Sequence, residues 1–160
     1  MYKKILLSCL LPFTLLANDT INSENLNYIQ IGKFFELKEL TKEEQKTLAK
    51  LLVNSKEVID LKGKKVDKIT NIKDIYISDY DKTLIIYEFI SDFRALGVLP
   101  SQYSILIGLL RKNTINSVCA DKSILKSVNL GLQFVYLYKD TYGIEISKTL
   151  IDKNTCSSNN

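Results

Sequence analysis

The stretch Tyr80–Leu96, YDKTLIIYEFISDFRAL, decides how the fold is interpreted. Apolar residues occupy most of its positions, so in a helix they would cover nearly the whole circumference. Ser78 or Asp79 could cap such a helix at its start, and Gly97 could end it. We therefore predict a helix over residues 79–96 and expect it to be the most buried element of the protein.

The sequence on both sides of this stretch predicts further helices. Thr41 and Glu44 have the spacing of a capping box, Pro100 suits a helix start, and Asp121 can cap another helix. Residues 64–78 fit neither a helical nor a strand period, although Ile75 to Ile77 could be a short extended piece. The predicted helices span residues 41–61, 79–96, 100–112, 121–139 and 144–151. The expected fold class is all-α, a small bundle of four to five helices.

Residues 1–17 have the layout of a secretory signal. Two lysines precede an apolar run, Ile5–Leu16, of about 12 residues, which is shorter than the roughly 20 that a membrane-spanning helix needs. We predict cleavage near Ala17, and hence an exported protein without a stable membrane anchor. An alternative is lipidation of Cys9, which follows Leu-Leu-Ser as in a lipoprotein processing box.

The rest of the chain has the length of one domain. We predict a loose N-terminal arm over residues 18–36, a single helical domain over 37–156 and a disordered tail over 157–160. Loss of the two signal lysines lowers the formal net charge from +4 to +2. A nearly neutral chain with only two arginines argues against a nucleic-acid partner.

Cys119 and Cys156 are the two cysteines that remain after signal removal. An even number of cysteines in an exported chain favours a disulfide between them. Closing a loop of roughly 38 residues would stabilise the fold by about 4 kcal/mol in the chain-entropy model. The alternative is two separate buried thiols.

The residue types exclude most catalytic chemistry. The chain has no histidine, which removes Ser-His and Cys-His nucleophile pairs and most zinc sites. Ser123 and Lys126 have the S-x-x-K spacing of penicillin-recognising enzymes, but the S-D-N and K-T-G elements that accompany it there are missing. We predict that the protein is not an enzyme and has no catalytic residues, cofactor or metal site.

Four residues are candidates for binding a partner. Tyr138 and Tyr142 are spaced i,i+4 and lie off the inward face of the predicted helix, and tyrosine is favoured at binding surfaces. Glu88 and Asp92 share a face at i,i+4 on the most apolar predicted helix. We expect those two carboxylates to form its solvent-facing strip or, alternatively, a site for a cation or a partner.

The second half of the chain also resembles a known family. Tyr87–Leu96 is similar to a helix of the type Tyr-Ile-x-Gly-x-x-Asp-Ala-Leu. Cys119–Ile124 begins a capped helix that contains Val135–Leu137, and Cys156 follows near the C-terminus. In this order of features, residues 80–156 resemble the Tai-type immunity proteins of bacterial type VI secretion.

The resemblance implies a small exported helical protein that blocks a peptidoglycan amidase effector in the periplasm by steric occlusion. We therefore predict a periplasmic or secreted, non-catalytic binding protein whose partner is another protein, and by resemblance such an amidase. The alternative function is that of a periplasmic chaperone or stress protein, which would need apolar surface exposed under stress.

Overall fold

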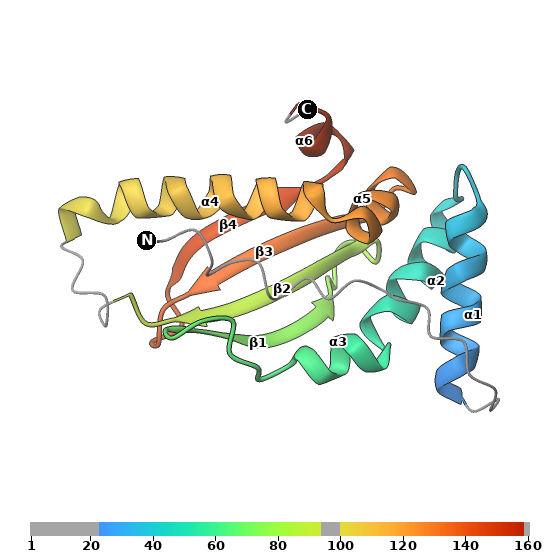
Figure 1. Ribbon diagram of the computed structural model, residues 1–160, viewed down its shortest axis with the longest axis horizontal. Coiled ribbons are helices and arrows are strands. Elements are labelled where there is room, and N and C mark those ends of the chain that lie inside the picture. The colour runs from blue at the N-terminus through green and yellow to red at the C-terminus, as the bar shows by residue number, and fades with distance from the viewer. Residues whose placement is uncertain (1–22, 94–99, 159–160) are drawn as a thin grey trace.

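The computed structural model describes residues 23–93 and 100–158 of the 160-residue chain (Figure 1). The predicted signal peptide and its cleavage site near Ala17, Cys9, and the last two residues of the predicted tail lie outside this part of the chain. The elements in chain order are α1 (Ser23–Glu36), α2 (Lys42–Val53), α3 (Lys56–Leu61), β1 (Thr70–Ile77), β2 (Leu84–Ser91), the 3-10 turn η2 (Pro100–Gln102), α4 (Tyr103–Ala120), α5 (Lys122–Asn129), β3 (Gln133–Lys139), β4 (Glu145–Ile151) and α6 (Lys153–Ser157).

The fold is mixed α/β, so the prediction of an all-α bundle is wrong. Four strands form one sheet in the order β1-β2-β3-β4. The central pair β2 and β3 is parallel, whereas β1 and β4 pair antiparallel with their neighbours at the two edges. The parallel connection from β2 to β3 contains α4 and α5, as a crossover between parallel strands requires.

The stretch predicted as the most buried helix is strand β2. The helices cover one face of β2, and the other face carries the half-buried Ile86 and Ile90, so its sequence is a continuous apolar run rather than an alternating one. Such a run cannot be distinguished from a buried helix by its period. Its Ile, Tyr and Phe side chains favour a strand, and in the register of the sheet Ile85 lies opposite Phe134 and Tyr87 opposite Tyr136.

The other predicted elements are confirmed in part. Predicted helix 41–61 is present as α2 and α3, with a break at Asn54, and its capping box is present, with the Thr41 N–H donating to the Glu44 carboxylate at 2.7 Å. Predicted helix 100–112 is longer in the structure and continues through Cys119. The range 121–139 is α5 followed by β3, and 144–151 is β4 rather than a helix. The extended piece expected at Ile75 to Ile77 is the end of β1.

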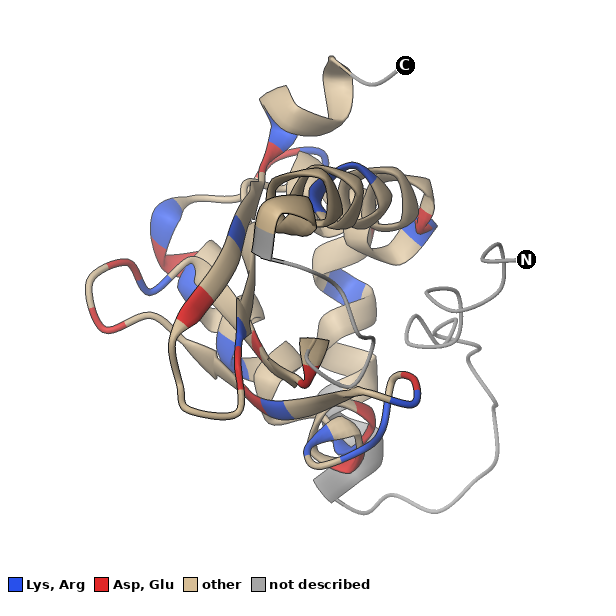
Figure 2. Cartoon of the chain, turned by 90° about the vertical axis from the view of Figure 1, so that its left-hand side faces the viewer, with Lys and Arg blue, Asp and Glu red and all other residues tan. Residues whose placement is uncertain are grey.

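The helices lie to one side of the sheet (Figure 2). Helix α4 packs along β4, and α2 and α3 pack near β1 (Figure 1). The core between the two layers contains Leu48 from α2, Val118 from α4, and Ile75 and Ile85 from the sheet, all nearly inaccessible. Four aromatic rings stack across the centre of this face, from β2 (Tyr87, Phe89) and β3 (Tyr136, Tyr138).

Much of the predicted loose N-terminal arm over 18–36 is ordered as helix α1. The helix contacts α2 and buries Ile31 in the core. The predicted tail is also partly ordered, because α6 extends through Ser157. In the part of the chain that the structure describes, no helix is both long and apolar enough to cross a membrane.

The disulfide between Cys119 and Cys156 is confirmed, so the alternative of two separate thiols is wrong. It joins the last turn of α4 to α6, across a sequence separation of 37 residues. One end of α4 is thereby tied to the segment that follows β4. The other end of α4, near Tyr103, lies at the far side of the sheet (Figure 1).

Candidate protein-binding groove

A groove of about 250 Å³ opens at the N-terminal end of α4, between the helix and the sheet. We call it the α4 groove. Three segments line it: the end of β2, the first turns of α4, and the turn from β3 into β4. Its lining residues are Ser91, Asp92, Phe93, Tyr103, Leu106, Ile107, Asp140, Thr141, Ile144, Glu145 and Ile146.

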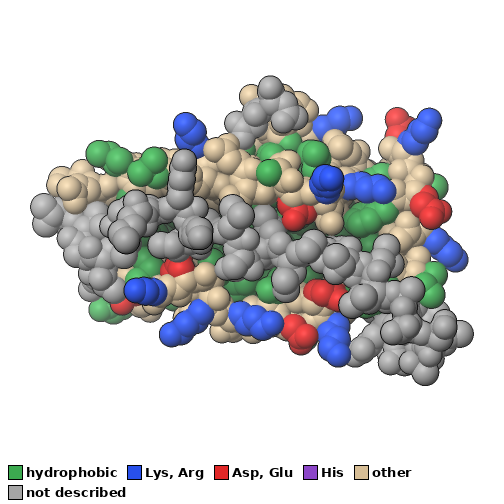
Figure 3. All heavy atoms as spheres, in the orientation of Figure 1, with side chains coloured by type: hydrophobic (Ala, Val, Ile, Leu, Met, Phe, Trp, Pro, Cys, Tyr) green, Lys and Arg blue, Asp and Glu red, His purple; other side chains and the backbone are tan. Residues whose placement is uncertain are grey.

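Exposed apolar side chains occur on two of the elements that form this groove. Ile105 and Leu109 are 65% and 54% exposed on α4, and Tyr142 and Ile144 are 70% and 65% exposed on the β3–β4 turn. Figure 3 shows hydrophobic side chains at the surface over the N-terminal half of α4. Ile144 lines the groove, whereas Ile105 and Leu109 do not and lie on another side of α4 than Tyr103 and Ile107.

The β3–β4 turn is held rigidly by its own hydrogen bonds. The Asp140 carboxylate accepts from the backbone N–H groups of Tyr142 and Ile144, both at 2.8 Å, and the Gly143 N–H donates to the Asp140 carbonyl at 3.0 Å. Gly143 has a φ of 83°, which a residue with a side chain adopts only with strain. The turn therefore presents Tyr142 and Ile144 in a preorganised position, which lowers the entropic cost of binding.

All charged side chains that line the α4 groove, among the described residues, are acidic. They are Asp92, Asp140 and Glu145. Lys139 is adjacent in sequence, but its ammonium group contacts the Glu88 carboxylate at 2.9 Å. The apolar lining therefore has an acidic rim, which favours cationic groups on whatever binds there.

Glu88 lies on the face of the sheet that points away from the helices, and it is buried instead of solvent-facing as predicted. The Nζ atoms of Lys139 and Lys73 lie 2.9 and 3.1 Å from its carboxylate. Burial raises the pKa of Glu88, but the hydrogen bonds from Lys139 and Lys73 outweigh burial and lower the pKa below 4.5. The same contact with Glu88 raises the pKa of Lys139.

The structure separates the four predicted partner-binding residues. Tyr142 is exposed beside the α4 groove, and Asp92 lines it. Tyr138 is buried at 4% exposure, because it lies in a strand and stacks on Phe89 with ring centroids 4.6 Å apart. Glu88 and Asp92 share no helical face, since β2 ends before Asp92. The partner-binding roles of all four residues stay predictions.

Sequence reasoning missed the exposed apolar residues of α4. The side of α4 that faces the sheet carries Tyr103, Leu106 and Leu110. Ile105 and Leu109 lie outside this side of the helix. That surplus of apolar residues on an amphipathic helix was a signal for a second apolar surface. The predicted turn at Gly143 is present, but nothing in the sequence places it next to α4.

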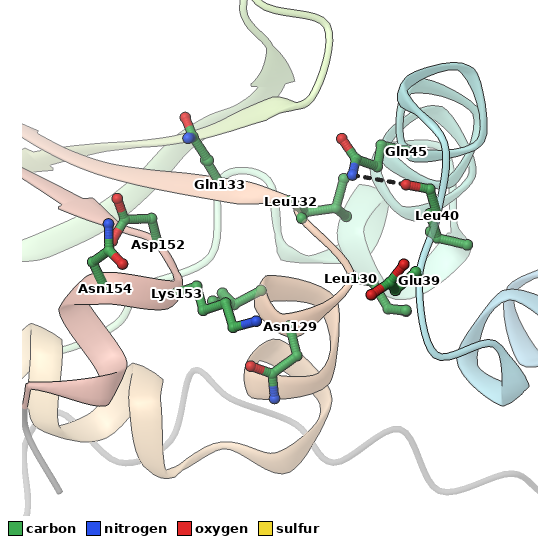
Figure 4. A pocket seen from close by; sticks show the side chains of 12 residues that line it. Glu39, Leu40, Gln45, Asn129, Leu130, Leu132, Gln133, Asp152, Lys153 and Asn154 are labelled. Atoms are coloured by element: carbon green, nitrogen blue, oxygen red, sulfur yellow. Dashed lines mark hydrogen bonds between the residues drawn. The ribbon is translucent and has the colours of Figure 1, made fainter.

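A second cavity, of about 380 Å³, lies where α2, α5 and β3 meet near the start of α6 (Figure 4). Its side chains are largely polar, among them Glu39, Asn129, Gln133 and Asp152. Within it, the Gln45 side-chain amide donates to the Leu40 carbonyl at 3.2 Å. Among the residues that line this cavity, no nucleophile contacts a base, so we assign it no catalytic role.

The S-x-x-K pair has no catalytic arrangement. Lys126 lies 5.4 Å from the centre of the Phe35 ring, as in a cation–π contact, and Ser123 lines a small apolar crevice. Among the described residues, no group of three His, Cys, Asp or Glu side chains is placed to hold a metal ion.

Comparisons with known proteins give a fold but no family. No family model matches the chain, and no curated protein matches it. Among solved structures, a candidate secreted protein from Pseudomonas aeruginosa is similar with a TM-score of 0.59 and 11% identity, over 72% of this chain and 95% of its own. The pilotin EpsS of the type 2 secretion system of Vibrio vulnificus is similar with a TM-score of 0.51 and 14% identity, over 81% and 96%. At such identities the likeness shows the fold alone.

Proposed function

We propose that this chain is an exported, non-catalytic protein that binds a segment of another protein in the α4 groove. The observation that carries the proposal is the 65% exposure of Ile144 in the lining of a groove whose rim turn, with the 70% exposed Tyr142, is fixed by hydrogen bonds. Leaving large apolar side chains in water is unfavourable, and covering them with a partner removes that cost.

Export is supported by the disulfide and by the fold. Disulfides persist in oxidising compartments, and Cys119 and Cys156 form one here. The two similar structures are described as a candidate secreted protein and as a pilotin of a secretion system. A periplasmic or secreted location agrees with both descriptions.

A binding role without catalysis is supported by the chemistry of the groove. Its described lining contains carboxylates and hydroxyls but no lysine, and the chain has no histidine to act as a base. The amidase partner remains a proposal from the sequence resemblance alone. Two of the features that carry this resemblance differ in the structure: the expected helix at Tyr87 is strand β2, and Val135–Leu137 lie in strand β3 and not in the capped helix.

The proposal is tested by affinity capture from envelope extract with two matched variants. Ile144→Gln removes an exposed apolar side chain that lines the groove, and Ile59→Gln removes the same kind of side chain with similar exposure, 52%, on α3. We expect the Ile144 variant to bind its captured partner about tenfold or more weakly, as lost apolar burial predicts, and the Ile59 variant to bind like the parent protein.

The nature of the captured material separates the functions. One stoichiometric partner lost only in the groove variant supports the proposal, and an amidase among such partners would support the immunity role. Many unfolded clients, retained by all variants, would favour the chaperone function instead. Equal capture of one partner by the parent and the groove variant would overturn the α4 groove as its binding site.

A further inference from the structure

The charge of the α4 groove restricts the partner that it fits. We infer that the segment bound there is amphipathic and basic, with apolar side chains toward Leu106 and Ile107 and Lys or Arg side chains toward the acidic rim. This inference rests on the proposed function and adds the chemistry of the partner. The observation behind it is the juxtaposition of apolar lining residues with the carboxylates of Asp140 and Glu145.

The position of the rim is fixed by local structure. The Asp140 carboxylate accepts two backbone hydrogen bonds, which hold it at the turn beside the groove. Lys139, the lysine next to the rim in sequence, is held on the opposite face of the sheet by Glu88. Arg111 and Lys112, the basic residues of α4, follow Leu110, beyond the residues that line the groove.

The combination of apolar and acidic lining residues also selects for such a segment. An apolar floor flanked by carboxylates fits Lys or Arg well, because their aliphatic stems can lie on apolar surface while the charged ends reach the rim. An acidic segment would bring like charges together and lose affinity. The same acidic rim disfavours an anionic lipid surface as the occupant.

A selection from a display library of random linear peptides tests the inference. Peptides are selected on the oxidised protein and counter-selected on the Ile144→Gln variant, so that only groove-dependent binders are retained. We expect these binders to be enriched in Lys and Arg together with apolar residues. Their affinity should fall as salt is raised, because exposed charge pairs are screened within about 10 Å at 0.1 M ionic strength.

Two matched charge variants assign the selectivity to the rim. Glu145→Gln should weaken the basic peptides about threefold, while Glu43→Gln, which neutralises a carboxylate that is 82% exposed elsewhere, should leave them unchanged. Equal weakening by both variants would overturn the assignment to the rim.

Each remaining outcome is also decisive. Groove-dependent binders with no excess of basic residues would overturn this inference and leave the proposed function intact. A complete lack of groove-dependent binders would count against both. Self-association of the protein that the groove variant abolishes would make a second copy of the chain the occupant, and it too would overturn the inference.

Discussion

Reduction of the Cys119–Cys156 disulfide should destabilise the fold by about 4 kcal/mol. The bridge closes a loop with a sequence separation of 37 residues, and in the chain-entropy model a loop of this length restricts the unfolded chain by that amount. With a urea dependence of about 2 kcal/mol per molar, typical of a domain of this size, the unfolding midpoint should fall by about 2 M. Because the bridge acts on the unfolded state, the reduced protein should also show a steeper urea dependence.

Urea unfolding followed by far-ultraviolet circular dichroism measures this change in the oxidised and the reduced protein. The variant Cys119→Ala/Cys156→Ala is the matched control, and its unfolding curve should not respond to reductant. A midpoint shift of less than about 0.5 M on reduction, with an unchanged urea dependence, would refute the loop-entropy argument. It would mean that the covalent link restricts the unfolded chain much less than its loop length predicts.

Two further predictions concern the turn beside the groove and the opposite face of the sheet. Gly143→Ala should lower the free energy of unfolding, measured with urea, by about 1–2 kcal/mol, because the φ of 83° is unfavourable for alanine. An added Cβ would meet nothing within 4 Å, so the effect would come from the backbone alone. An unchanged free energy of unfolding would show that the turn relaxes easily. Glu88→Gln should lower the free energy of unfolding by about 1–2 kcal/mol at neutral pH. This is less than the loss of a fully buried ion pair would cause, because Lys73 and Lys139 keep part of their side chains in water. Since the folded-state pKa of Glu88 is lowered, its stabilising effect is present above the ordinary value of 4.5 and is lost as pH falls through the lower folded-state pKa. The difference in unfolding free energy between parent and variant should therefore shrink in acid, and a difference independent of pH would contradict the ion-pair argument.

Features that depend on neighbours in sequence were predictable. The capping box of Thr41 and Glu44 and the cap at Asp121, which accepts from the N–H groups of Ser123 and Ile124, involve residues no more than three positions apart. The turn at Gly143 is equally local. The disulfide was predictable for another reason, because it depended on a count of two cysteines rather than on geometry.

The strands and the α4 groove were decided by tertiary structure. Ile85 pairs with Phe134 only because α4 and α5 cross over the sheet between them, and an apolar run such as β2 fits a buried helix and a central strand equally well until that partner is known. The groove likewise combines Asp92, the start of α4 and the turn at Asp140, which are adjacent only in the folded chain. Local hydrogen bonding was therefore encoded within a few residues, whereas the sheet and the binding surface depend on contacts between distant segments, which no local pattern specifies.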